Sequence, residues 1–182
     1  MALFFISWTE LVSSESTRPV VTPEALTQEI HRLINHERIR AHLPPLSYDH
    51  RLAIIAKDHS IDMGRRNFFN HVNKAGEKPD DRAKKQGYSC KKVYKTFYTE
   101  GIGENIFQNN LYDSLRTKTS NGVVTAKIYN WNSVEEIARS TVTGWMQSPP
   151  HHKNIVEANY DRAGIGIFIT PDYKVYITQN FC

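Results

Sequence analysis

The spacing of apolar residues along this chain changes from helical near its start to strand-like at its end. In two early segments apolar residues recur every three or four positions, which predicts two amphipathic helices. Thr22 and Pro23 suit the cap and the first position of the first helix, which should end before Pro44. The second helix should begin near Asp49. The two stripes consist of Leu26, Ile30, Leu33 and Ile34, and of Leu52, Ile55, Ala56, His59 and Met63.

The end of the chain has the pattern of an antiparallel hairpin. Residues 163–170 and 173–181 are rich in β-branched and aromatic residues, and a Pro-Asp turn separates them. Helices first and strands last are typical of a layered domain in which both kinds of element share one core. The sequence therefore predicts the α+β class.

The middle of the chain carries weaker signals. Residues 67–77 have the composition of a loop, and a short helix should follow from Asp80 and end at Gly87. Residues 111–131 are polar and aromatic around a Ser-Asn-Gly turn, which indicates a hairpin-like excursion.

One more helix is predicted after this excursion. Ser133 and Glu136 have the spacing of a capping box, in which each side chain bonds the backbone of the other residue. The helix should run from there to Pro149 and Pro150, which we expect to stop it.

Length and composition indicate one ordinary globular domain. The chain has 182 residues, of which 40% are hydrophobic and 23% charged, enough for a sizeable core. Residues 1–21 are interpreted as a flexible leader or the remnant of a signal peptide, and residues 22–182 as the domain. The apolar run Met1–Trp8 lacks a cationic flank and is too short for a membrane span, so none is expected.

The net charge of +4 gives a slight preference for acidic partners. Lysines gather between Lys84 and Lys95 with aromatic residues among them, as on a surface that binds phosphates and stacks bases. A solvated loop beside a helix explains the same residues more simply, and no nucleic-acid partner is expected. The residues concerned are Lys84, Lys85, Lys91, Lys92 and Lys95, with Tyr88, Tyr94, Phe97 and Tyr98.

The two cysteines leave two alternatives open. A bridge between Cys90 and Cys182 would tie the end of the sequence to a loop in its middle, as an oxidising compartment permits. Two reduced, buried thiols are the other alternative.

Three segments contain the side chains with the most distinctive chemistry: Asn67-Phe-Phe-Asn-His71, Gly103-Glu-Asn-Ile106 and Trp145-Met-Gln-Ser-Pro-Pro-His-His-Lys-Asn-Ile155. Each should place a histidine or a glutamate in a loop or at a helix end. Neutral imidazole nitrogens and carboxylate oxygens are ligands that zinc and related divalent ions accept. Spacing alone does not bring them together, because dispersed residues lack the tight pattern of a metal motif.

These segments, with Asn35-His-Glu-Arg38 and Ile177-Thr-Gln-Asn-Phe181, resemble the bacterial and archaeal branch of the CAP superfamily. That superfamily groups cysteine-rich secretory proteins, antigen 5 and plant pathogenesis-related proteins. The resemblance covers about residues 22–182. It implies a three-layer α-β-α sandwich with a central, mainly antiparallel sheet and a cleft that holds two histidines and two acidic residues.

By position in these motifs, the resemblance assigns His71 and His151 as ligands of a divalent metal ion, most simply zinc. Glu104 would be the first acid and would act through a water molecule or through a metal-binding histidine. His152 stands where the family often has arginine. His59 and Asn35 are interpreted instead as buried structural side chains, because they lie on helix faces that should meet the core.

The second acid of the family is missing. It usually lies five or six residues before the tryptophan, where this chain has Ser140 and Arg139. Glu136 lies one helical turn before Ser140 and is a candidate replacement, although its capping role is the simpler explanation. Any reaction that needs two carboxylates is therefore in doubt.

The resemblance implies an extracytoplasmic or secreted protein whose signal peptide is absent or truncated in this sequence. The favoured hypothesis is a metal-containing module that binds a lipid, glycan or protein and is not an enzyme. One alternative is a metal-dependent peptidase or esterase with Glu104 as general base. A nucleophilic Ser148 is a further catalytic candidate, and a charge-driven adhesion surface over Lys84–Lys95 is the third hypothesis.

Overall fold

The computed structural model describes residues 18–182, so the apolar run Met1–Trp8 and most of the predicted leader lie outside the described residues. A four-stranded sheet with the order β1-β7-β8-β4 forms its centre. Strands β4, β8 and β7 pair antiparallel, and only β1 pairs parallel, with β7. The strands are β1 (Ser47–Tyr48), β4 (Gly103–Asn110), β7 (Arg162–Ile169) and β8 (Lys174–Phe181).

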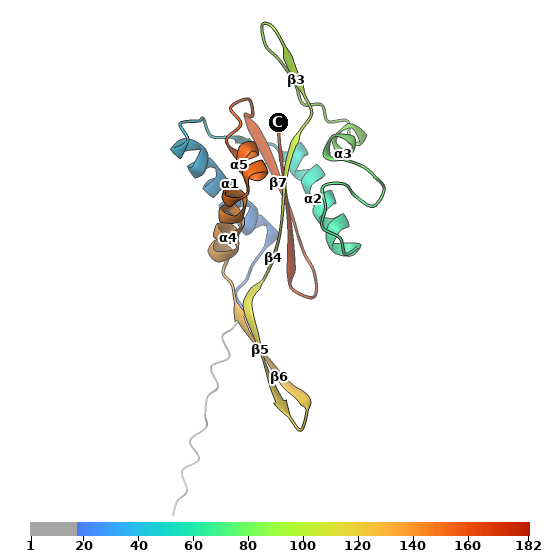
Figure 1. The fold of residues 1–182 in the computed structure, drawn as a ribbon, viewed down its shortest axis with the longest axis vertical. Coiled ribbons are helices and arrows are strands. Elements are labelled where there is room, and N and C mark those ends of the chain that lie inside the picture. The colour runs from blue at the N-terminus through green and yellow to red at the C-terminus, as the bar shows by residue number, and fades with distance from the viewer. Residues whose placement is uncertain (1–17) are drawn as a thin grey trace, which may run out of the picture.

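Helices cover both faces of this sheet (Figure 1). Helices α1 (Pro23–Arg40), α4 (Val134–Gln147) and α5 (Pro149–Ile155) form one layer. Helices α2 (His50–Arg65) and α3 (Pro79–Lys85) form the other. The α+β class and the three-layer sandwich expected from the resemblance are confirmed.

The two predicted apolar stripes face the sheet. Of the first stripe Leu26, Ile30 and Ile34 are fully buried, and all five residues of the second stripe are buried. Thr22 caps α1 by accepting a hydrogen bond from the Ala25 amide, and Asp49 caps α2 in the same way. The predicted starts of both helices are confirmed.

Two glycines let α2 lie unusually close to β7. A Cβ atom on Gly164 would lie 2.1 Å from the Ala53 backbone nitrogen, and one on Gly166 would lie 1.9 Å from the Lys57 nitrogen. No side chain fits such distances, so glycine at these positions sets the spacing between this helix layer and the sheet. The Glu104 carboxylate of β4 lies on the same side of the sheet as this interface, because it pairs with Arg82 of α3.

Two hairpins extend from opposite ends of the domain (Figure 1). Strands β2 (Lys91–Val93) and β3 (Tyr98–Glu100) form the shorter one, and β5 (Tyr112–Ser120) and β6 (Val123–Trp131) form the longer one. The second confirms the excursion predicted for residues 111–131. At the base of the first, Cys90 and Cys182 form a disulfide, which decides between the two alternatives that the sequence leaves open.

The structure corrects two local expectations. Pro149 and Pro150 do follow the end of α4, but they occupy the first positions of α5, so the chain continues as a helix in a new direction. Glu104 lies in strand β4 and not in a loop or turn. Gly103 and the polar residues around it concealed this edge strand of the central sheet, because they do not alternate with apolar ones.

Candidate functional site

His71, Glu104 and His151 come from three separate elements and meet at one end of the sheet. His71 lies in the loop between α2 and α3, Glu104 is the second residue of β4, and His151 is the third residue of α5. The Nδ1 atom of His71 is 2.9 Å from Oε1 of Glu104. The ring centroids of His71 and His151 are 6.1 Å apart. The structure therefore brings together the three residues that the motifs single out.

The hydrogen bond to Glu104 fixes the tautomer of His71. A carboxylate oxygen can only accept, so the Nδ1 of His71 carries the proton and donates it. In the neutral ring Nε2 is then an unprotonated nitrogen that can bind a metal ion or accept a proton. The side chain of His71 is 44% exposed, whereas that of Glu104 is 2% exposed. Glu104 therefore acts on the site through His71.

Arg82 balances the buried charge of Glu104. Its Nη2 atom is 2.5 Å from Oε2 of Glu104, and its Nη1 atom donates to the backbone oxygens of His71 and Glu77. One guanidinium thus holds both the carboxylate and the loop that carries His71. Sequence analysis missed this residue because it stands among other charged residues of α3, with no pattern that distinguishes it.

His59 lies on the other side of the same carboxylate. Its Nε2 atom is 3.0 Å from the Asn70 backbone oxygen and 4.0 Å from Oε1 of Glu104. Burial is the main cause that lowers the pKa of His59 below its usual value, so the ring is neutral near pH 7. The prediction that His59 is a buried, hydrogen-bonded histidine is confirmed.

Two asparagines fix α5, and with it His151, against β4. Asn105 is fully buried and donates to the His151 backbone oxygen. Asn154 donates to the Glu104 backbone oxygen and to the side-chain oxygen of Asn105. Both belong to the quoted motifs, but sequence analysis gave them no role. These contacts give both asparagines a structural role. They hold the helix that carries His151 against the strand that carries Glu104.

Helix α5 is also held from the opposite side, by Arg38 of α1. This guanidinium is fully buried and donates four hydrogen bonds to backbone oxygens. Three of those oxygens belong to the end of α5 and the turn after it, namely Ile155, Glu157 and Tyr160, and the fourth is that of Pro44.

His151 is suited to the neutral form. Burial is the main cause that lowers its pKa, and the neighbouring His71 lowers it further. A neutral imidazole is the form that binds metal ions, since protonation removes the lone pair. In residues 18–182, however, no group of three or more His, Cys, Asp or Glu side chains is arranged to hold a metal ion. In the part of the chain that the structure describes, the arrangement therefore offers a pair of imidazoles without a third protein ligand.

The remaining candidates lie apart from this pair. Glu136 is exposed and accepts a hydrogen bond from the Ser133 amide, which is its predicted capping role. Ser148 joins α4 to α5, and among the hydrogen bonds of residues 18–182 none connects it to His151. Ser140 accepts a hydrogen bond from Asn109 of β4. Because Glu104 is five residues earlier in that strand, Ser140 lies apart from the histidine pair.

Two of the five lysines between Lys84 and Lys95 have acidic partners. Lys85 is paired with Glu77 and Lys92 with Asp161. Tyr88, expected among the stacking side chains, is buried and donates to Asp49. Burial is also the main cause that raises the pKa of Tyr88 to about 12.

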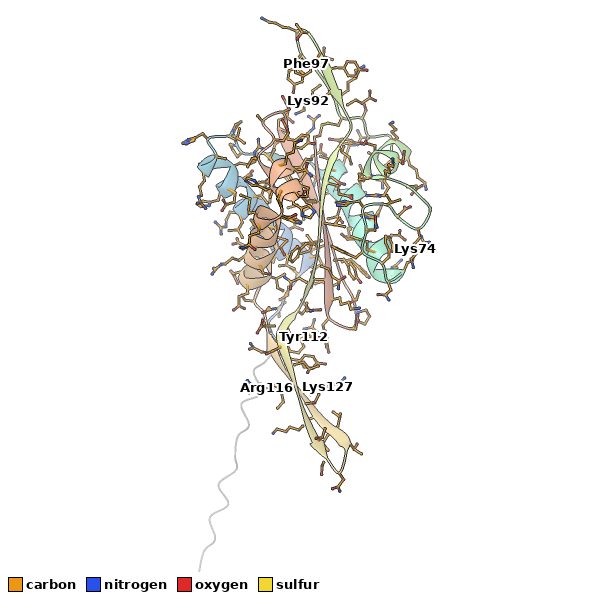
Figure 2. The ribbon with its side chains drawn as sticks, viewed as in Figure 1. Lys74, Lys92, Phe97, Tyr112, Arg116 and Lys127 are labelled. Carbon is orange, nitrogen blue, oxygen red and sulfur yellow. A yellow bond between two sulfur atoms is a disulfide. The ribbon has the colours of Figure 1, made fainter. Side chains whose placement is uncertain are left out.

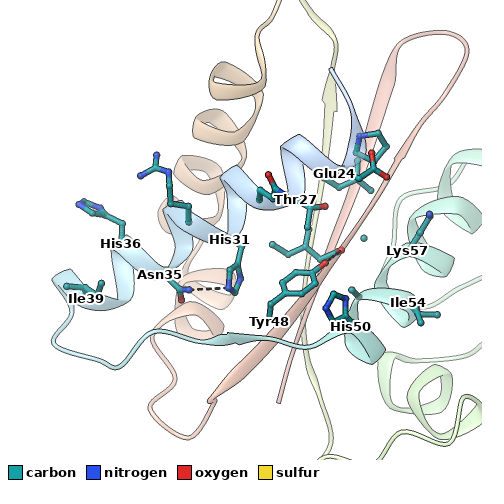
Figure 3. Close-up of a pocket in the computed structure, with 17 residues that line it drawn as sticks. Glu24, Thr27, His31, Asn35, His36, Ile39, Tyr48, His50, Ile54 and Lys57 are labelled. Carbon is teal, nitrogen blue, oxygen red and sulfur yellow. Dashed lines mark hydrogen bonds between the residues drawn. The ribbon is translucent and has the colours of Figure 1, made fainter. Parts of the chain in front are cut away.

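A hollow lies away from the histidine pair, between α1 and α2 (Figure 3). Its volume is about 990 Å³, and Ile165 and Ile167 of β7 contribute to its lining together with Tyr48. Asn35 also lines it and exchanges two hydrogen bonds with the Leu46 backbone, which confirms its structural role. We call this hollow the α1–α2 groove.

Comparison with known proteins agrees with this architecture. The fold is a three-layer α-β-α domain, similar to that of an SCP-domain protein described as extracellular. The chain belongs to the CAP family, the Cysteine-rich secretory protein family, whose family model matches residues 31–181.

The solved structures and curated proteins similar to this chain include the following three. An extracellular SCP-domain protein from Bacillus anthracis has 25% identity and a TM-score of 0.58, with 90% of this chain and 44% of that chain covered. An outer surface protein from Borrelia burgdorferi has 16% identity and a TM-score of 0.62, with 88% and 94% covered, and shows the fold alone. Uncharacterized protein YkwD from Bacillus subtilis is 31% identical over 142 residues, 78% of this chain and 42% of that protein. The chain thus spans about two fifths of this curated relative.

In residues 18–182 no helix is both long and apolar enough to span a bilayer.

Proposed function

We propose that this chain is an extracytoplasmic binding domain whose His71 and His151 together hold a divalent metal ion, most simply zinc. The observation that carries the proposal is the hydrogen bond between His71 Nδ1 and Glu104 Oε1. A carboxylate that accepts from one nitrogen of an imidazole is the usual arrangement behind a metal-binding histidine, because it orients the ring and makes the other nitrogen more basic.

The spacing of the two rings is compatible with one shared ion. A zinc-nitrogen bond is about 2.1 Å, so a bound imidazole has its centre roughly 3 Å from the ion and two such rings lie up to about 6 Å apart. The observed separation of 6.1 Å is at the upper end of this range. With two protein ligands, water or a bound ligand would complete the coordination.

The site favours a binding role over hydrolysis. A general base must reach the water that it activates, but both oxygens of Glu104 already accept hydrogen bonds and its side chain is 2% exposed. A nucleophilic serine needs a base within hydrogen-bond reach, and none of the hydrogen bonds within residues 18–182 gives Ser148 that contact with His151.

Among the ligands considered, the α1–α2 groove supports one with an apolar portion, such as a lipid, over a glycan. Its lining includes Ile39, Ile54, Ile165 and Ile167, and its volume is that of a typical small-molecule site. Ile54→Glu would place a charge at the groove, where Ile54 is exposed. We expect the variant to bind a fluorescent fatty acid at least about tenfold more weakly, by the cost of burying a charge in apolar surroundings. Unchanged binding would exclude the α1–α2 groove as the site that binds the fatty acid.

An extracytoplasmic location is supported by the disulfide, which persists in oxidising compartments, and by similarity to proteins described as extracellular or outer-surface. A membrane-impermeant protease or label applied to intact cells that produce the full chain should reach it. Complete protection, with the protein intact inside, would contradict this part of the proposal.

Metal binding is tested by calorimetry with zinc on the wild type and on His71→Ala/His151→Ala. A matched control is His36→Ala/His42→Ala, which removes the same number of imidazoles from α1 and the turn after it. The site variant should lose the binding isotherm and the control should keep it. Equal zinc uptake by the wild type and the site variant would show that His71 and His151 do not form the zinc site.

A further inference from the structure

The hairpin formed by β2 and β3 ends in a group of exposed apolar side chains. Val93 is 77% exposed, Phe97 54% and Tyr98 59%, although each is large and apolar. Figure 2 shows Phe97 on the hairpin that extends from one end of the domain. Single exposed apolar residues are ordinary, but several at the tip of one projecting hairpin mark an interaction surface. We call residues 91–100 the aromatic finger.

The aromatic finger is held in place by covalent and polar contacts at its base. Cys90, directly before it, is bonded to Cys182, and the Gly101 amide directly after it donates to the Cys90 backbone oxygen. The Lys92 ammonium is 3.0 Å from Asp161. The tip is closed by a hydrogen bond between Tyr94 and Phe97. An ordered finger loses little conformational freedom when it binds.

The aromatic finger carries both aromatic rings and lysines. Tyr94 stacks on Phe97 with ring centroids 4.5 Å apart, and the Lys91 ammonium lies 4.5 Å from the centre of the Tyr98 ring. Within residues 18–182, neither Lys91 nor Lys95 takes part in an ion pair. The sequence of the finger holds three lysines and one acidic residue, Glu100. Its partner should therefore be both apolar and negatively charged.

We propose that the aromatic finger inserts its tip into the surface of an anionic lipid bilayer. Tyrosine and phenylalanine are favoured where a membrane meets water, and cationic side chains beside them are attracted by the negative surface potential of anionic lipids. The finger would enter only the headgroup region, with Lys91 and Lys95 at the level of the phosphates. This inference is independent of the metal site, which lies at the histidine pair.

The ribbon of β5 and β6 at the opposite end provides a matched control. Its tip exposes Val123 and Val124, 65% and 51% exposed, with no aromatic side chain beside them in the turn. Substituting two exposed apolar residues at either tip should change the free energy of unfolding by less than about 0.5 kcal/mol, because neither pair lies in the core.

The test is sedimentation of the full chain with vesicles of phosphatidylcholine alone and of phosphatidylcholine with phosphatidylglycerol. We expect binding to the anionic vesicles only, a loss of at least about tenfold in Val93→Ser/Phe97→Ser, and near-wild-type binding in Val123→Ser/Val124→Ser. Lys91→Ala and Lys95→Ala should each weaken binding about fivefold. A loss in the finger variant that does not exceed the loss in the ribbon variant would overturn the proposal.

Fluorescence gives a positive signal for insertion. In Phe97→Trp the emission of the introduced tryptophan, measured as the difference from the wild type, should shift to the blue on addition of anionic vesicles and be quenched by brominated lipids. In Val123→Trp the emission of the introduced tryptophan should show neither change. Binding of soluble polyglutamate without any of these vesicle effects would identify an acidic protein partner and would also overturn the proposal.

Discussion

Removing the disulfide, in Cys90→Ala/Cys182→Ala, should lower the free energy of unfolding by about 4 to 5 kcal/mol. The two cysteines are separated by 92 positions, and closing a loop of that length in the unfolded chain costs about 4.6 kcal/mol of entropy at 25 °C. The variant also loses a contact between the Arg162 guanidinium and the Cys182 sulfur. A loss of this size is a large part of the total stability of an ordinary domain.

The assay is guanidinium denaturation followed by tryptophan fluorescence, in which the fully buried Trp145 should report the loss of the core. The oxidised wild type, the reduced wild type and the double variant should be compared. Reduced wild type keeps both sulfur atoms, so the difference between it and the oxidised protein isolates the effect of the loop. A change of less than about 1 kcal/mol would refute the reasoning, since it would mean that the unfolded chain gains little freedom when the bridge is absent.

Three other changes test the packing and charge of the fold. Arg38→Met removes four hydrogen bonds that a fully buried guanidinium donates to backbone carbonyls, and should cost about 3 kcal/mol or more in denaturation experiments. A neutral effect would contradict the role of this residue in fixing α5. Gly166→Ala should lower the free energy of unfolding by about 3 kcal/mol or more, or prevent folding, because the new Cβ would lie 1.9 Å from the backbone of α2. A variant as stable as the wild type would show that α2 and β7 do not lie this close together. Burial is the main cause that lowers the pKa of His31, His59 and His151 below 6.5, so the stability they contribute is present above pH 6.5 and is lost as the pH falls below it. The melting temperature measured from pH 8 to pH 5 should therefore fall, and a rise over this range would contradict the assignment.

The sequence predicted the elements whose signals are local. The stripe from Leu52 to Met63 and the caps Thr22 and Ser133 depend on residues within a few positions of one another, and the structure confirms them. It also confirms the helix start near Asp49. Strand β4 escaped prediction because its buried side chains include Glu104 and Asn105, whose partners come from distant elements.

The site was predictable only in part, for the same reason. The motifs identified His71, Glu104 and His151 through family resemblance, since nothing in their spacing requires them to meet. Arg82 makes its decisive contacts with residues 11 and 22 positions away, and no local pattern reveals such contacts. Sequence analysis therefore gave Arg82 no role.

The place of the missing second acid also depends on the fold. Ser140 contacts Asn109, and Asn109 is five residues beyond Glu104 in an extended strand, a distance of about 16 Å along it. The described residues therefore offer one buried carboxylate at the histidine pair, and Glu104→Gln tests its contribution. Loss of a carboxylate behind a metal-binding histidine should reduce zinc affinity about tenfold or more in calorimetry. An unchanged affinity would show that Glu104 serves only to pair with Arg82.

The most direct test of the histidine pair is diffraction from crystals soaked with zinc, recorded on both sides of the zinc absorption edge. The account predicts one anomalous peak about 2.1 Å from a ring nitrogen of His71 and from a ring nitrogen of His151, with Glu104 still bonded to Nδ1 of His71. Zinc bound elsewhere while the two rings remain without a shared peak would contradict it.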